Sequence, residues 1–207
     1  MRIIFLLSSI IILLFSMPAT AEDLGFEKTE NGILQKLLKP PKPNMPLFKT
    51  RGKSRALAGK TYKVRGLTVV KRQTGKVKFV EKNVDIPQKR DGGYVNIEVH
   101  FDVNSSTIRP NSIKILEQLG GALARSELKK KSFFINGHTD SDGSAEYNLN
   151  LSLKRAISVR RYLTNTHSIS STRLKIMGLG EGVPLVENTS ELNKQTNRRV
   201  EIVAIIN

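Results

Sequence analysis

The sequence of 207 residues contains no cysteine. This absence excludes structural disulfide bonds and also excludes attachment of a lipid through a cysteine thioether. A domain of more than about 100 residues can rely on its own hydrophobic core, so the fold does not need covalent cross-links. The chain is long enough for one such domain with an appendage.

Acidic residues are missing from Asn31 to Val80, a stretch that carries 14 Lys and Arg residues. The whole chain has a formal charge of +16, and residues 22–90 hold 18 basic against six acidic residues. Residues 91–207 are close to balanced, with 15 basic and 12 acidic residues. The excess positive charge therefore belongs to the N-terminal part, which is typical of an arm that faces a polyanion.

A long apolar run is also missing. Residues 3–15 are apolar apart from two serines, but this run is shorter than the ~20 residues that a membrane-spanning helix needs. Arg2 precedes it and Ala19-Thr20-Ala21 follows it, which is the pattern of a signal peptide with its cleavage site. We expect a signal peptide over residues 1–21 and export to the periplasm; the alternative is an uncleaved anchor.

Patterns typical of catalysis are lacking. The sequence shows no nucleophile paired with a base, no phosphate-binding glycine loop and no catalytic pair of carboxylates. The three histidines, His100, His138 and His167, are too few and too scattered for a zinc site. We expect a binding protein and not an enzyme, with no catalytic residues and no cofactor.

A calcium loop is excluded by its spacing. Asp140-x-Asp142-Gly143 superficially matches the start of an EF-hand. That loop requires a Gly at its sixth position and a Glu at its twelfth, where this chain has Ala145 and Leu151. We therefore expect no metal site.

The N-terminal part divides into two segments. Residues 22–60 are basic and include the proline-rich stretch 40–46, which predicts a partly disordered linker with an extended spacer. A short apolar pattern at residues 33–38 is compatible with one or two helical turns. Residues 61–93 alternate weakly and predict either a short β-hairpin around Gln73-Thr74-Gly75 or further linker.

Regular structure is predicted from Tyr94 onward. Strands are expected from Tyr94 to Phe101, over 132–138, over 173–177 and over 199–206. Helices are expected after Pro110, with Ile113, Leu116, Leu119 and Leu123 buried, and over about 145–164. Residues 178–197 are expected to be a loop with at most one helical turn. The fold class is therefore α/β, a β-α-β-α-β-β sandwich with helices on one face of a mixed sheet.

The turn after the second of these strands carries the candidate binding residues. Asp140 lies in this turn, and Asn148, Ser152 and Arg155 share one face of the following helix. The guanidinium of Arg155 can bind a carboxylate through two hydrogen bonds, and Asp140 can accept from an ammonium group. Two simpler interpretations remain: Asp140 only shapes the turn, and Arg155 only extends its charged end to solvent.

These residues carry a resemblance to a known family. The chain resembles the OmpA-like peptidoglycan-binding domain family, which includes the C-terminal domain of OmpA and the Pal and MotB types. Four blocks match in order over about 94–206: Phe101-x-x-Asn104-Ser105 with Pro110; Gly137-His138-Thr139-Asp140 with Gly143, Tyr147-Asn148, Leu151-Ser152 and Arg155-Ala156; Gly178-x-Gly180-Glu181 with Pro184; and Asn197-Arg198-Arg199-Val200-Glu201-Ile202. Residues 22–93 are not covered, so the resemblance places the domain at 94–207.

The resemblance implies non-covalent binding of the meso-diaminopimelate in the stem peptide of peptidoglycan. By motif position, Asp140 would bind the free amine and Arg155 the carboxylate of that residue. Hydrogen bonds would come from Asn148, Thr139 and Asn104, and Arg198 would border the pocket. The implied location is the periplasm, in association with the outer membrane and the cell wall of a Gram-negative cell.

A second function remains open from the charge distribution. In this alternative the basic residues 22–90 act as the main functional part, and they dock onto an anionic membrane surface or an acidic envelope protein. Nucleic acid is not expected as a partner of an exported protein.

Overall fold

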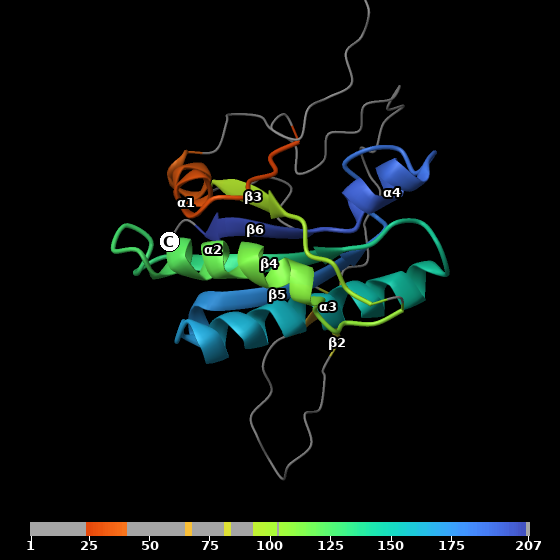
Figure 1. The fold of residues 1–207 in the computed structure, drawn as a ribbon. Coiled ribbons are helices and arrows are strands. Elements are labelled where there is room, and N and C mark those ends of the chain that lie inside the picture. Colours follow the sequence, from red (N-terminus) through yellow and green to blue (C-terminus); the bar gives the residue numbers. More distant parts are fainter. Residues whose placement is uncertain (1–23, 41–64, 68–80, 84–92, 103, 206–207) are drawn as a thin grey trace, which may run out of the picture.

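The computed structural model describes residues 24–40, 65–67, 81–83, 93–102 and 104–205, and the expected signal segment 1–21 lies outside them. Figure 1 shows the helices and strands of the described part. In chain order they are α1 (Glu30–Leu38), β1 (Arg65–Leu67), β2 (Glu81–Asn83), β3 (Tyr94–Ile97), a 3-10 turn (Pro110–Ser112), α2 (Ile113–Ala124), β4 (Ser132–His138), α3 (Ala145–Thr166), a 3-10 turn (Ser171–Arg173), β5 (Leu174–Gly180), α4 (Glu191–Asn197) and β6 (Val200–Ile205).

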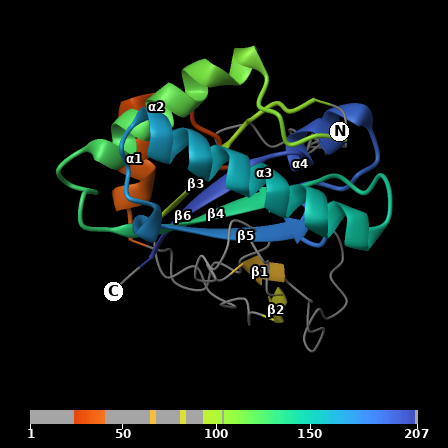
Figure 2. The same ribbon diagram turned by 90° about the horizontal axis from the view of Figure 1, so that it is seen from below.

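The strands form one mixed sheet in the order β2-β1-β5-β4-β6-β3. Strands β4 and β5 are parallel, and β6 inserts antiparallel between β4 and β3. Helices α1, α2 and α3 lie on one side of this sheet, and α4 lies at the end where β6 begins (Figure 2). The predicted fold class, an α/β sandwich with helices on one face of a mixed sheet, is confirmed.

The core lies between this face of the sheet and the three helices. Every second residue of β4, Phe133 and Ile135, faces the helices and is fully buried. Leu116, Leu119 and Leu123 of α2 contribute as predicted to the same cluster. The remaining member of the predicted face, Ile113, is 38% exposed and lies at the first position of α2, directly after the 3-10 turn.

Helix α1 corrects the prediction of a linker over residues 22–60. Thr29 caps the helix by accepting a hydrogen bond from the Gly32 backbone N–H at 3.1 Å. Ile33, Leu34 and Leu37 are buried in the main core, where α1 packs against α2. A nine-residue helix is marginal by itself, so its stability depends on packing that the local sequence does not reveal. Residues 41–60 of the expected linker lie outside the described part.

The segment before α1 lies along the edge of the sheet. Phe26 forms a parallel bridge with Asn96 of β3. The Asn96 side chain donates to the Leu24 carbonyl at 2.6 Å, and its backbone N–H donates to Gly25 at 3.0 Å. This segment and α1 are therefore part of the same folded unit as residues 93–205.

Strands β1 and β2 extend the opposite edge. They pair antiparallel with Arg65 opposite Asn83, and β1 also pairs antiparallel with β5. The turn expected at residues 73–75 lies outside the described residues.

Three element boundaries differ from those predicted. The first strand ends at Ile97, and the later residue Phe101 makes only an isolated bridge to Ile108. Strand β5 continues to Gly180, although residues 178–197 were expected to be a loop. The same stretch contains α4, which is two turns long and not one. Within the described residues, no helix combines the length and the apolar character needed to cross a membrane.

Gly137 lets α3 approach the sheet closely. A Cβ atom on this residue would lie 2.0 Å from the backbone oxygen of Ser152, which cannot move without displacing α3. We expect Gly137→Ala to lower the free energy of unfolding by about 3 kcal/mol or more, through overpacking of the contact. Urea denaturation measures this change, and a loss too small to detect would mean that α3 moves away from β4 without cost.

Candidate ligand-binding site

A tight turn joins β4 to α3 and forms one part of the site. Gly143 takes a φ of +99°, a conformation that a residue with a side chain rarely adopts. Ser144 follows as the N-cap of α3, and its hydroxyl accepts a hydrogen bond from the Tyr147 backbone N–H at 3.2 Å. These two residues fix the direction in which α3 leaves the sheet.

Asp140 has a structural role in this turn and also faces the site. One carboxylate oxygen accepts the backbone N–H of Asp142 at 3.1 Å, and the other accepts from the Arg198 guanidinium at 2.6 Å. A carboxylate has about four lone-pair positions, so it can accept further donors. The residue is 7% exposed, and it therefore presents negative charge in a partly desolvated place. The interpretation as a turn former is correct and does not exclude ligand binding.

Arg155 lies on α3 with its guanidinium largely buried. Its Nε donates to the Ser105 backbone oxygen at 3.2 Å, and its Cζ lies 5.0 Å from the centre of the Phe101 ring. The residue is 8% exposed. Among the described residues, no side chain or backbone oxygen accepts a hydrogen bond from its two terminal nitrogens. The simple interpretation, a side chain extended into solvent, is therefore wrong.

Burial lowers the pKa of Arg155 from its ordinary value, because the charged form loses water. The nearby Asp140 opposes this shift, and the positive charge of Arg198 adds to it. An arginine stays protonated at neutral pH even so. The site therefore holds a buried cation whose terminal donors are available to an anion.

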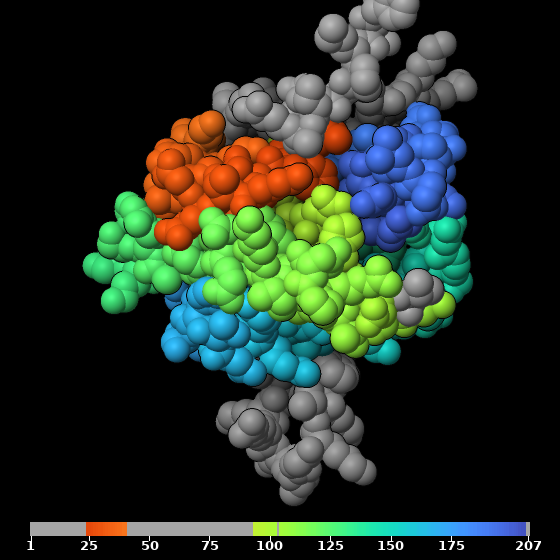
Figure 3. Space-filling view, in the orientation of Figure 1, coloured from red at the N-terminus to blue at the C-terminus, as the bar shows by residue number. Residues whose placement is uncertain are grey.

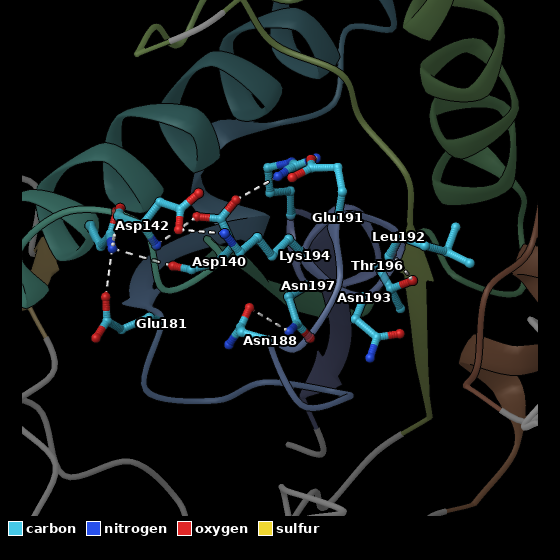
Figure 4. Close-up of polar contacts among 12 residues, drawn as sticks. Asp140, Asp142, Glu181, Asn188, Glu191, Leu192, Asn193, Lys194, Thr196 and Asn197 are labelled. Atoms are coloured by element: carbon cyan, nitrogen blue, oxygen red, sulfur yellow. Dashed lines mark hydrogen bonds and ion pairs between the residues drawn. The ribbon is translucent and has the colours of Figure 1, made fainter.

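Asn148 is held by three oxygen atoms. Its amide nitrogen donates to the Glu181 carboxylate at 2.6 Å, to the Asp142 carbonyl at 3.0 Å and to the Asp140 carbonyl at 3.3 Å. Figure 4 shows the Glu181 contact below the turn. No described residue donates to the amide oxygen in these contacts, so Asn148 can act in binding as an acceptor while its nitrogen fixes the turn.

Two smaller residues also line the site. The hydroxyl of Thr139 is buried and has no hydrogen-bond partner within the described residues. Asn104 is exposed on the facing loop with a φ of 53°, a region that Asn tolerates better than most residues. Both can offer a side-chain hydrogen bond to a ligand.

Helix α4 closes the site, where the sequence prediction allowed at most one helical turn. Arg198, at its end, binds Asp140 and also Glu191 at 2.5 Å. Burial alone would lower the pKa of Arg198, but the hydrogen bonds to these two carboxylates raise it. A second link joins Lys194 to Asp142 at 2.7 Å (Figure 4). The available sequence signal was Ser190, which caps the helix, followed by Glu191 in the first turn.

The cavity between these elements has a volume of about 450 Å³. The structure brings all six predicted site residues to its wall: Asp140, Arg155, Asn148, Thr139, Asn104 and Arg198. The sequence prediction missed several other lining residues: Phe101, Arg109, Tyr147, Glu191 and Gln195. Phe101 and Tyr147 stand in the motif blocks but were not assigned to the site, and Arg109, Glu191 and Gln195 belong to none of these blocks.

Ser152 was expected beside Asn148 on the wall of the cleft, and this expectation is wrong. The residue is fully buried. Its hydroxyl donates to the Leu149 carbonyl at 2.8 Å and accepts the Gly180 backbone N–H at 2.9 Å. Ser152 therefore fixes α3 to the end of β5 and does not reach a ligand.

The arrangement suits a ligand that carries both charges. Arg155 offers donors to an anion, and Asp140, on the wall of the same cavity, offers acceptors to a cation. Among the described residues no cluster of acidic or histidine side chains has the arrangement of a metal site. The cavity therefore offers donors and acceptors of both kinds that a zwitterionic group requires.

Known proteins with similar sequences share this region. The family model described as "OmpA family" matches residues 100–198. Outer membrane porin F of Pseudomonas aeruginosa is 34% identical over 107 residues, which are 52% of this chain and 30% of that protein. Outer membrane protein A of Bordetella avium is also 34% identical over 107 residues, 52% of this chain and 54% of that protein.

One solved structure is the peptidoglycan-associated lipoprotein from Burkholderia pseudomallei. It is 30% identical, with a TM-score of 0.47, over 52% of this chain and 88% of that one. The chain spans about a third to a half of the length of the curated relatives named above. The matched region contains β4, α3, β5 and α4 together with every residue of the cavity wall except Val99. Residues 100–198 of this chain therefore form an OmpA family domain.

Proposed function

We propose that the protein is an exported, non-catalytic protein of the cell envelope that binds the meso-diaminopimelate stem peptide of peptidoglycan. Arg155 would bind the carboxylate at the distal end of diaminopimelate, and Asp140 would bind the free amine beside it. Thr139, Asn148 and Asn104 would add hydrogen bonds, and Arg198 would border the ligand. By holding the wall in this way, the protein would tether the envelope or a partner to it.

The observation that carries the proposal is the buried guanidinium of Arg155, whose terminal nitrogens donate to none of the described residues. Burying a charge without full hydrogen bonding is costly, and such a cost is tolerated where a ligand completes the bonds. A carboxylate matches the guanidinium fork with two parallel hydrogen bonds. Asp140 supplies the opposite charge. It lies close enough to oppose the effect of burial on the pKa of Arg155.

The location proposed is the periplasm, next to the outer membrane and the wall. The leader-like residues 1–21 support export. The relatives with similar sequences bear the names of outer membrane proteins, which supports an envelope location.

Co-sedimentation with isolated diaminopimelate-type sacculi tests the proposal. We expect the wild type to pellet with the sacculi and Asp140→Ala to remain in the supernatant. The matched control is Glu127→Ala, which removes an exposed carboxylate outside the cavity and should pellet like the wild type. Circular dichroism checks that Asp140→Ala is folded, because the same carboxylate caps the turn.

A folded Asp140→Ala protein that still pellets in full would contradict the site assignment. A wild type that does not pellet would contradict the function itself.

A further inference from the structure

A second cavity of about 740 Å³ lies next to the candidate site. Its walls come from four separate segments: residues 24–29 before α1, residues 98–100 after β3, the first turns of α2 and the outer side of α4. Figure 3 shows the N-terminal segment, the stretch after β3 and α4 meeting on one face of the molecule. We refer to this cavity as the outer groove.

The outer groove and the candidate site are adjacent. His100 and Gln195 line both cavities. Gln195 donates to Glu98 at 3.0 Å, which fixes its amide at the border between them. A ligand anchored in the first cavity therefore has the outer groove directly beside it.

The lining of the outer groove combines apolar surface with neutral polar groups. Phe26, Ile115 and Leu192 supply the apolar part. Asn111 and Thr196 supply amide and hydroxyl groups, which both donate and accept hydrogen bonds. Sugar rings offer apolar C–H faces together with hydroxyl and acetamido groups at their rims, so they match such a surface.

Charge in the outer groove does not favour an anion or a cation. Its lining includes two basic residues, Lys28 and Lys114, and two acidic residues, Glu27 and Glu98. A purely anionic partner would find carboxylates in its way, and a purely cationic partner would find ammonium groups. A large neutral ligand with many hydroxyl groups meets neither obstacle.

Leu192 is an exposed apolar residue in the lining of the groove. Its side chain is 73% exposed and lies on the side of α4 that faces away from Asp140 (Figure 4). An apolar side chain this exposed beside a polar groove is suited to contact with a ligand.

We propose that the outer groove binds the disaccharide of the peptidoglycan glycan strand while the candidate site holds the stem peptide of the same polymer. This inference rests on the proposed function. Two amino acids separate diaminopimelate from the sugar in the stem peptide, and an extended chain covers ~3.5 Å per residue. The sugar therefore lies within reach of the neighbouring cavity.

Two ligands test the inference by isothermal titration calorimetry: the free stem tripeptide that ends in diaminopimelate, and the same tripeptide on its disaccharide. We expect the wild type to bind the disaccharide form about tenfold more tightly, a gain equal to one or two hydrogen bonds. The double variant Asn111→Ala/Leu192→Ser should lose this gain and bind the free tripeptide like the wild type. Both residues are exposed, so the variant is expected to fold.

The matched control is Ile113→Ser, which replaces an exposed apolar residue of α2 outside both cavities. It should bind both ligands like the wild type. Equal affinity of the wild type for the two ligands would overturn the inference and leave the proposed function standing. Failure to bind either ligand would overturn the proposed function, and the inference with it.

Discussion

Replacing Arg155 with methionine is expected to lower the affinity for a diaminopimelate-type stem tripeptide by about 100-fold, the value of two charge-assisted hydrogen bonds. Methionine keeps much of the apolar stem that packs near Phe101 but removes the donors. Isothermal titration calorimetry measures the affinity. Arg161→Met, an exposed arginine of the same helix, is the matched control and should bind like the wild type.

The same substitution should not weaken the fold. Within the described part of the chain the buried guanidinium makes one hydrogen bond, to Ser105, and burial disfavours its charged form. Replacing a buried, incompletely bonded charge with an apolar side chain of similar volume is often neutral or stabilising. Urea denaturation of Arg155→Met should therefore give a free energy of unfolding equal to that of the wild type or higher. This combination separates a binding residue from a residue that supports structure.

The ligand provides the second half of this experiment. A lysine-type stem peptide lacks the distal carboxylate, so it should bind the wild type weakly and leave Arg155 unpaired. With Arg155→Met the two peptides should bind with similar affinity, because the group that discriminates between them is gone. This is a double-mutant cycle between one side chain and one ligand group. An unchanged preference for the diaminopimelate peptide would show that another residue recognises the carboxylate.

The turn and α3 were predictable because each is specified by nearby residues. Gly143 supplies the required backbone conformation, Ser144 caps the helix, and Asn148 and Arg155 follow at helical spacing. Local rules of this kind need no knowledge of the rest of the chain. The same helical spacing led to a wrong position for Ser152. Spacing shows which side chains share one face of a helix, but it does not show which part of that face the sheet covers.

The wall contributed by α4 was not predictable in the same way. Helix α4 is only seven residues long, and it is held over the site by ion pairs to Asp140 and Asp142, which lie more than 50 positions earlier. Its preceding loop depends on Asn197, which binds Leu185, Val186 and Asn188. Such contacts are set by the tertiary fold, and short helices stabilised by packing have little signal of their own.

Replacing Leu37 with alanine is expected to lower the free energy of unfolding by about 2–5 kcal/mol, the usual effect of truncating a buried leucine. Leu37 is 1% exposed and belongs to the same cluster as Leu116 and Ile97. A linker residue would show almost no change, since exposed positions contribute within about 0.5 kcal/mol. Urea denaturation followed by circular dichroism measures the difference.

The matched control is Gln35→Ala, an exposed position on the same helix. Alanine has the higher helix propensity, so this variant should be as stable as the wild type. If Leu37→Ala were equally stable, α1 would be dispensable and the domain would begin near Tyr94, as the sequence alone suggested. A single unfolding transition, shifted to lower urea by Leu37→Ala alone, would instead place the start of the cooperative unit before α1.

The residues that border the outer groove at 24–29 lie between that start and the helix, so a protein truncated at residue 94 would lose part of the groove as well as stability.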